Sequence, residues 1–183
     1  MAFNFWRNAP VRIKRILTIA AFFFLAIVIT VAGILTPLSN EDINTLGEGL
    51  EETRENIQSL PELQQVSSIF GNNFMICLVG FVPIAGPIFE FYALYSTGVV
   101  ISAYAAYDES IQASPLLLFL LLFIFPFTWL EFLAYSTAIA ESFWLIWRII
   151  QHKWKTEIKN ACILISICAM MLLVAAIIEA ALI

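Results

Sequence analysis

Charged residues are scarce in this chain. Asp, Glu, Lys and Arg make up 13% of its 183 residues, whereas hydrophobic residues make up 61%. Soluble domains carry about 25% charged and about 45–50% apolar residues, so this composition excludes an ordinary soluble globular domain. With nine Lys and Arg residues in all and a net charge of −5, the chain has no basic patch of the kind that binds nucleic acid.

Histidine and closely paired cysteines are also missing. The single His152 lies among basic residues, and Cys77, Cys162 and Cys168 lie in apolar segments without the CxxC spacing of a zinc site. No serine has a histidine partner that the sequence brings near it. We therefore interpret the cysteines as small buried side chains, and we expect no enzyme activity, no metal site and no cofactor.

Long apolar runs are what the sequence has instead. They cover residues 16–36, 71–107, 115–147 and 161–183. A helix needs about 20 apolar residues to cross a bilayer, so the first and last runs fit one span each. The middle two are too long for one span and short for two. The first run exceeds the roughly 7–15 apolar residues of a cleavable signal peptide, and we interpret it as an uncleaved span.

The basic residues divide the chain into two sides of a membrane. Four precede the first run and four lie just before the last one, and such residues collect on the cytoplasmic side. We therefore expect cytoplasmic segments at 1–15 and 148–159. The segment 37–70, with seven acids and one Arg, is expected to be an extracytoplasmic loop. This arrangement requires an odd number of crossings between that loop and the second basic segment, and three crossings give about five spans.

The extra crossing is expected within 71–107, since Val82-Pro83-Ile84-Ala85-Gly86-Pro87 favours a tight cytoplasmic turn between two helices. One broken helix over 71–107, which gives four spans, and re-entrant half-helices are the alternatives. The run 115–147 is expected to be one helix that is kinked or broken near Pro126. The predicted fold is all-α: a polytopic integral membrane bundle, 71–183 after the first span, with Pro/Gly-broken central helices.

Within the acidic loop, residues 39–66 have the pattern of two amphipathic helices. The apolar positions with 3–4 spacing are Ile43, Leu46, Leu50, Ile57 and Leu60. Ser39 with Asp42, and Ser59 with Glu62, have the spacing of capping boxes. The apolar stripe either packs on the outer ends of the protein's own spans or binds a partner.

Four glutamates interrupt the apolar runs: Glu90, Glu131, Glu141 and Glu179. Charged side chains in a membrane usually face the bundle interior or mark an ion pathway. Glu131 is the deepest, and we expect it to face the interior beside Pro126 and to bond to a freed carbonyl, to Asn73 or to a serine. Glu141 is expected nearer the cytoplasmic surface. Glu90 is expected at the interface and Glu179 near water.

Two further patterns concern this set. Asn72 and Asn73 open the predicted second span, where they cap the helix or bond across helices. The segment Glu90–Thr97 is similar to Glu131–Thr137 with one residue dropped, and each follows a Pro break. Transporters often contain internal repeats, but in a composition this biased chance explains a match of this length.

Four short motifs between residues 69 and 142 carry a family resemblance. They are Phe70-Gly71-Asn72-Asn73, the turn region from Gly80 to Gly86, Tyr95-Ser96-Thr97-Gly98, and Pro126-Phe127-Thr128-Trp129-Leu130-Glu131. Together they resemble the stage II sporulation protein M family in its archaeal-type form. Ser96 stands where the family usually has Asn, and Phe127 where it has His. From the motifs and the apolar runs, the candidate functional residues are Asn72, Asn73, Gly98, Pro126, Glu131 and Glu141.

The resemblance implies five spans and a role without enzyme activity. In spore-forming bacteria the founding member resembles a membrane scaffold that recruits peptidoglycan hydrolases and is not a hydrolase itself. We therefore interpret the chain as a scaffold or accessory subunit of a complex in the plasma membrane, with a cytoplasmic N-terminus. Its expected partners are membrane lipids and other membrane proteins or a second copy of itself. The alternative is a small-solute or ion transporter or channel that uses Glu131 and the broken helices.

The charge pattern predicts that Lys153 and the N-terminus lie on the same, cytoplasmic, side. Single cysteines at positions 4, 50, 111 and 153, placed in a cysteine-free background, are labelled from each side of sealed vesicles. Positions 4 and 153 should react only from the cytoplasmic side, and positions 50 and 111 only from the other. Reaction of position 153 together with position 50 contradicts the predicted topology.

Overall fold

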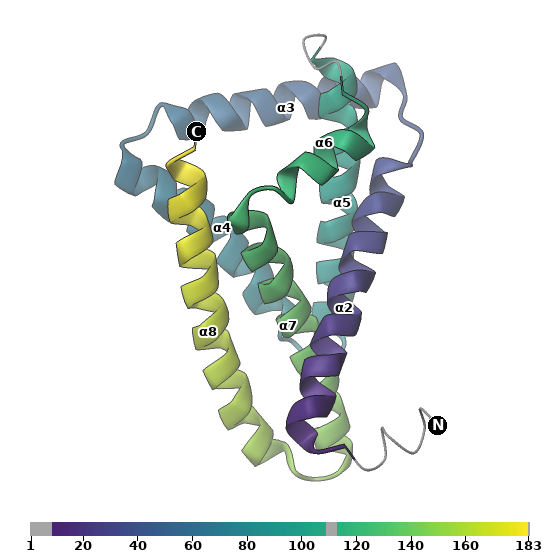
Figure 1. Cartoon of the computed structure of the whole chain (residues 1–183), viewed down its shortest axis with the longest axis vertical. Helices are drawn as coiled ribbons and strands as arrows, with labels where there is room; N and C mark the ends of the chain where they lie inside the picture. Colours follow the sequence, from purple (N-terminus) through teal and green to yellow (C-terminus); the bar gives the residue numbers. More distant parts are fainter. Residues whose placement is uncertain (1–8, 109–112, 183) are drawn as a thin grey trace.

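The computed structural model describes residues 9–108 and 113–182, and these residues form seven helices without a strand (Figure 1). The helices are α2 (Val11–Ile34), α3 (Asn40–Gln58), α4 (Glu62–Gly80), α5 (Ala85–Tyr107), α6 (Pro115–Leu122), α7 (Pro126–Ile150) and α8 (Trp154–Ala180). The all-α prediction is confirmed. Most of the predicted cytoplasmic segment before α2, and the loop residues 109–112, lie outside the described residues.

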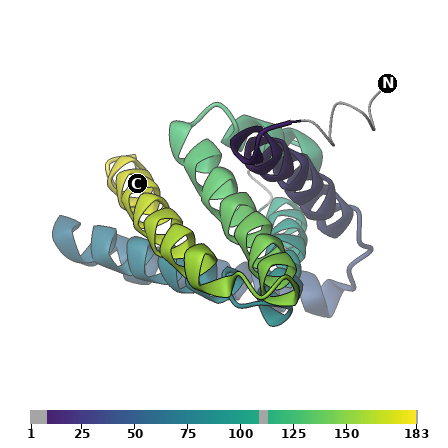
Figure 2. The ribbon, with the colours of Figure 1, turned by 90° about the horizontal axis from the view of Figure 1, so that it is seen from below.

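The helices run back and forth between two ends of the molecule (Figure 1). α2 leads to the end where α3 lies across the others, α4 leads back, α5 returns, α6 and α7 lead back again, and α8 returns toward α3. α7 packs against α8 and α2, α2 against α5, and α4 against α8 (Figure 2). The start of α2 and the α7–α8 turn thus share one end, called the basic end here. The other is called the α3 end.

Three helices are long and apolar enough to cross a membrane: α2, α5 and the part of α8 from Glu157 to Ala180. The pair α6 and α7 passes the same test together, with a bend of 89°, which gives up to four candidate spans. The fifth predicted crossing corresponds to α4, which lies within the bundle but begins with the polar stretch Glu62–Gln65 and carries Asn72 and Asn73. A count of five therefore stays a prediction.

The run 71–107 forms two helices, α4 and α5, joined by the turn at 81–84. The predicted turn is therefore present, and the single broken helix is wrong. A Cβ at Gly86 would lie 2.3 Å from the carbonyl oxygen of Gly80, so this close turn requires glycine. However, α4 begins at Glu62 and not near residue 71, because the polar residues before the apolar run are also good helix formers. Asn72 and Asn73 consequently lie inside the helix, and the capping role predicted for them is wrong.

The break near Pro126 is also present, and Pro126 is the first residue of α7. A break of this kind leaves backbone carbonyls without helical donors. The Thr128 hydroxyl donates to the Leu122 carbonyl and the Trp129 Nε1 to the Phe123 carbonyl, each at 2.7 Å. These bonds stabilise the bend, and Glu131, a turn further along α7, is not needed for it.

Helix α3 packs on the protein's own helices. Its predicted capping box exists: the Ser39 Oγ accepts from the Asp42 N–H at 3.2 Å, and the Asp42 carboxylate accepts in return. These bonds lower the pKa of Asp42. The second predicted box is wrong, since Pro61 and not Ser59 is the N-cap of α4 and makes no side-chain bond. The stripe from Ile43 to Leu60 is half-buried, which supports packing on the protein's own spans.

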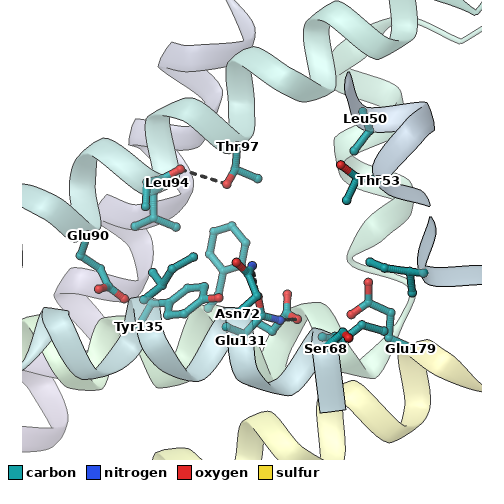
Figure 3. A pocket seen from close by; sticks show the side chains of 16 residues that line it. Leu50, Thr53, Ser68, Asn72, Glu90, Leu94, Thr97, Glu131, Tyr135 and Glu179 are labelled. Carbon is teal, nitrogen blue, oxygen red and sulfur yellow. Dashed lines mark hydrogen bonds between the residues drawn. The ribbon is translucent and has the colours of Figure 1, made fainter. Parts of the chain in front are cut away.

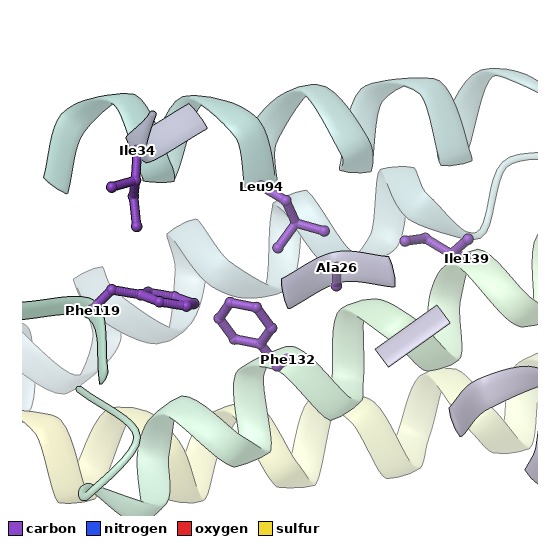
Figure 4. Close-up of a cluster of buried hydrophobic side chains, with 6 residues drawn as sticks. All are labelled: Ala26, Ile34, Leu94, Phe119, Phe132 and Ile139. Carbon is purple, nitrogen blue, oxygen red and sulfur yellow. The ribbon is translucent and has the colours of Figure 1, made fainter. Parts of the chain in front are cut away.

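Apolar side chains fill the interior and also cover the outside. One core cluster joins α2, α5, α6 and α7 and consists of Ala26, Ile34, Leu94, Phe119, Phe132 and Ile139 (Figure 4). A second includes Cys77 and Cys168, which are buried as predicted, whereas Cys162 is exposed. The outer faces of the helices expose many large apolar side chains, such as Phe24, Ile88 and Met170. An exposed apolar surface of this extent is what a membrane-embedded bundle requires.

The crossing of α2 and α5 yields a stability prediction at Gly98. A Cβ at this position would lie 2.0 Å from the carbonyl oxygen of Thr30, so Gly98→Ala should force the two helices apart and lower the free energy of unfolding by about 1–3 kcal/mol. Thermal unfolding in detergent measures the effect. Gly71→Ala is the matched control, because a Cβ there meets nothing within 4 Å. Equal stability of the two variants contradicts the packing of this crossing.

Candidate functional site

A cavity of about 510 Å³ lies inside the bundle near the α3 end. We call it the acidic cavity. It lies among α4, α5, α7 and α8, with α3 against its outer side (Figure 3). Its lining residues are Leu50, Thr53, Ile57, Ser68, Ile69, Asn72, Asn73, Ile76, Glu90, Ala93, Leu94, Thr97, Glu131, Phe132, Tyr135 and Glu179. Three glutamates from three different helices therefore meet at one cavity.

The polar groups of the acidic cavity form a row (Figure 3). Glu90 of α5 lies at one side of the view and Glu179 of α8 at the other, with Tyr135 and Glu131 of α7 between them. Glu131 and Tyr135 are four residues apart in a helix, so they share one face of α7. The row begins near the α4–α5 turn and ends close to α3, so it extends along the helices and not across them.

Glu131 is held by Asn73. The Asn73 Nδ2 donates to the Glu131 Oε1 at 2.5 Å, which joins the middle of α4 to the first turns of α7. The Asn72 Nδ2 lies 3.4 Å from the Asn73 Oδ1, so the two amides continue one polar wall. The interior position and the Asn73 contact were both among the expectations for Glu131, whereas a functional role for these residues stays a prediction.

Glu90 is the most deeply enclosed of the three glutamates. It is fully buried, and neither of its carboxyl oxygens has a hydrogen-bond partner among the described residues. Gly80 leaves the room for it, since a Cβ there would lie 2.4 Å from the Glu90 Oε2. An isolated buried carboxylate is costly, so this position requires a bound proton or a cation beside it.

The sequence did not predict that Glu90 and Glu179 line the acidic cavity. The interface position expected for Glu90 is wrong, because α5 begins at Ala85 and the residue lies more than a turn inside the bundle. Glu179 was expected near water; it is half-buried in the last turn of α8, and its place in the cavity lining was not predicted. The similarity of Glu90–Thr97 to Glu131–Thr137 was a usable signal, since both segments bring a glutamate to the same cavity.

Glu141 lies outside the acidic cavity, in an ion cluster at the basic end. Arg15 of α2 pairs with both Glu141 of α7 and Glu157 of α8, and the Arg148 Nε lies 3.4 Å from the Glu157 Oε2. The Trp144 ring lies 5.1 Å from the Arg15 guanidinium carbon. Although Glu141 is near the predicted cytoplasmic end, it is only 1% exposed. No local pattern predicts that Arg15 and Glu157 meet, because 142 positions separate them.

Gly98 and Pro126 shape the site without lining it. Gly98 lets α5 approach α2, which leaves its neighbour Thr97 on the cavity side. Pro126 starts α7 and thereby sets the depth at which Glu131 enters the interior. Both are therefore positioning residues in this structure.

The chemistry of the acidic cavity favours a cationic ligand. Its lining offers carboxyl, amide and hydroxyl groups beside apolar ones and includes no Lys, Arg or His. Within the described part of the chain, no group of three or more His, Cys, Asp or Glu side chains is arranged to hold a metal ion. The three carboxyl groups are thus spread along the cavity and not gathered around one point.

Substitutions at Glu131 test its contact with Asn73. In Glu131→Gln a side-chain carbonyl still accepts from Asn73, so stability should change little. Glu131→Leu leaves the buried amide without an acceptor and should cost about 1–3 kcal/mol in the free energy of unfolding. Unfolding in detergent measures both, with Glu52→Leu on the exposed face of α3 as the control. A Leu variant as stable as the Gln variant rules out a structural role for the pair.

Comparisons with known proteins agree with the motifs. The family model described as stage II sporulation protein M matches residues 19–182, which is most of the chain and includes every helix of the acidic cavity. No curated protein and no solved structure matches. This chain therefore belongs to the stage II sporulation protein M family and is a membrane protein of that family.

Proposed function

We propose that this protein binds a small organic cation in the acidic cavity and exchanges it for protons across the membrane. The observation that carries the proposal is the meeting of Glu90, Glu131 and Glu179 at one cavity inside the helical bundle. Ionisable residues within spans commonly mark substrate and proton pathways. The family resemblance favoured a scaffold, and the sequence did not bring these glutamates together. Their shared cavity favours the transporter alternative.

The size and lining of the cavity support an organic ligand. Small-molecule sites typically have volumes of about 300–1,000 Å³, and the acidic cavity, at about 510 Å³, lies in this range. Leu94 and Phe132 provide apolar surface for a carbon skeleton, while the carboxyl groups provide the counter-charge. A carboxyl group that gives up its proton becomes negatively charged and can pair with the incoming cation. The cation and the proton therefore compete for the same carboxyl groups.

Two features of the fold support movement of the ligand. α7 begins inside the bundle after the bend at Pro126, and helices interrupted in this way form the substrate sites of many transporters. α3 contributes Leu50, Thr53 and Ile57 to the outer side of the cavity. The stripe of α3 is half-buried, and Tyr104 of α5 bonds to Arg54 and Glu51 of α3, so the proposed route to the α3 end requires these contacts to open.

Reconstitution into liposomes tests the exchange. Purified protein is sealed in vesicles with a pH-sensitive dye, and ethylammonium, putrescine, tetraethylammonium or Na⁺ is added outside. Protons should leave the vesicle when an organic cation enters, and Glu131→Gln or Glu90→Gln should lower the initial rate at least about ten-fold, because an amide carries no exchangeable charge.

Glu55→Gln, an exposed change on α3, is the matched control and should keep the wild-type rate. Exchange that survives both cavity substitutions, or that is seen with Na⁺ alone, contradicts the proposal.

The second candidate is the scaffold or accessory subunit that the family resemblance implies. It is supported by the exposed acidic face of α3, which turns Glu41, Glu48, Glu52 and Glu55 away from the bundle. Such a face fits a basic partner protein. If the chain is a scaffold, gentle detergent extraction yields a stoichiometric partner that Glu48→Lys with Glu52→Lys releases, while the liposome assay stays at background. A chain that is extracted alone and exchanges cations is a transporter.

A further inference from the structure

A second cavity, of about 520 Å³, lies at the basic end between the first turns of α2 and the last turns of α7. Its lining residues are Val11, Lys14, Thr18, Phe143, Trp144, Trp147, Arg148 and Gln151. It shares no residue with the acidic cavity, and neither proposed function uses it. We call it the basic cavity.

Positive charge in the basic cavity comes from Lys14 and Arg148. The Arg148 Nε lies 3.4 Å from Glu157 and its Nη1 donates to the Gln151 Oε1 at 3.2 Å, whereas no described residue bonds to its Nη2. The guanidinium carbon also lies 5.9 Å from the centre of the Trp144 ring, which orients the group. Arg148 is therefore held in place with donor capacity remaining.

Of the nearby acids, Glu157 contacts both Arg15 and Arg148, whereas Glu141 contacts Arg15. Glu141 and Glu157 are buried and pair with Arg15 on the interior side, and no carboxylate lines the basic cavity. Further basic residues at the same end, which include Arg12, Lys153, Lys155 and Lys159, are exposed. An anion thus meets a positive end of the molecule before it reaches Lys14 and Arg148.

The rim of the basic cavity is apolar and faces outward. Trp147 is 57% exposed, Val11 46% and Phe143 45%. Trp side chains favour the level of the lipid headgroups. The exposed Phe143 beside Trp147 adds apolar surface that suits contact with acyl chains. A site with cationic donors inside and aromatic, apolar walls on its membrane side matches a molecule that has a charged head and an apolar tail.

We propose that the basic cavity binds the headgroup phosphate of an anionic phospholipid. Lys14 and Arg148 contact the phosphate oxygens, Gln151 and Thr18 lie beside the remainder of the headgroup, and an acyl chain lies along Phe143 and Trp147. Basic pockets between helices at this membrane level are suited to anionic headgroups. Because the cavity lies between α2 and α7, the bound lipid holds these two helices together next to the ion cluster of Arg15.

Binding by the delipidated full-length protein in detergent tests the proposal. Short-chain phosphatidylglycerol, short-chain phosphatidylcholine, glycerol phosphate and inorganic phosphate are each titrated, and the unfolding temperature and the change in tryptophan fluorescence are recorded. Phosphatidylglycerol should bind saturably and raise the unfolding temperature. Lys14→Gln and Arg148→Gln should each weaken this binding about five-fold, whereas Lys159→Gln, which removes an exposed charge at the same end, should not.

Three outcomes overturn the proposal. Equal affinity for phosphatidylcholine shows that the cavity does not recognise the negative charge of the headgroup. Equal affinity for inorganic phosphate assigns the cavity to a free anion. Equal weakening by Lys159→Gln shows diffuse attraction to the basic end and no site. If Arg148→Gln does not fold because its contact with Glu157 is lost, Lys14→Gln alone decides between the site and its absence.

Discussion

The burial of carboxyl groups in an apolar bundle is the constraint on which the rest of this structure depends. Each such group needs a partner, a bound proton or a cation beside it, and the carboxyl groups of this chain fall into two kinds. At the basic end, Glu141 and Glu157 are paired with arginines. In the middle, Glu131 has a neutral amide from Asn73, and Glu90 has no partner among the described residues. The difference separates an ion cluster from the carboxyl groups that, in the proposed function, exchange a proton for a cation.

This difference gives the two ends of the bundle different mechanical roles. The ion cluster of Arg15 ties α2, α7 and α8 together, and breaking a buried pair by removing one partner is strongly destabilising. At the α3 end, the cavity is covered by a helix whose apolar residues are only half-buried. The basic end is thus the firmer one, and the bundle is expected to open beside α3. A lipid bound between α2 and α7 would further stabilise the basic end.

The sequence predicted the helical class, the paired helices of 71–107 and the break at Pro126. These features depend on the length of an apolar run and on the position of proline, both of which are visible within a short stretch of sequence. The sequence also placed the two basic segments at the same end, because basic residues collect on one side of a membrane. It failed at helix starts, as at Glu62, where polar helix formers extend a helix beyond its apolar part. It failed most at the site. That Glu90, Glu131 and Glu179 meet depends on how α5, α7 and α8 are rotated about their axes, and contacts across many residues, such as Arg15 with Glu157, leave no local pattern.

In the proposed function, cation and proton compete for the carboxyl groups of the acidic cavity, and calorimetry measures this competition most directly. Putrescine is titrated into the detergent-solubilised protein in two buffers that differ in their heat of ionisation, so that the difference between the two heats counts the protons released. Binding of putrescine should release protons, and this release should be lost in Glu131→Gln. Binding whose heat does not depend on the buffer, or proton release that persists in Glu131→Gln and in Glu90→Gln, would contradict the proposed competition.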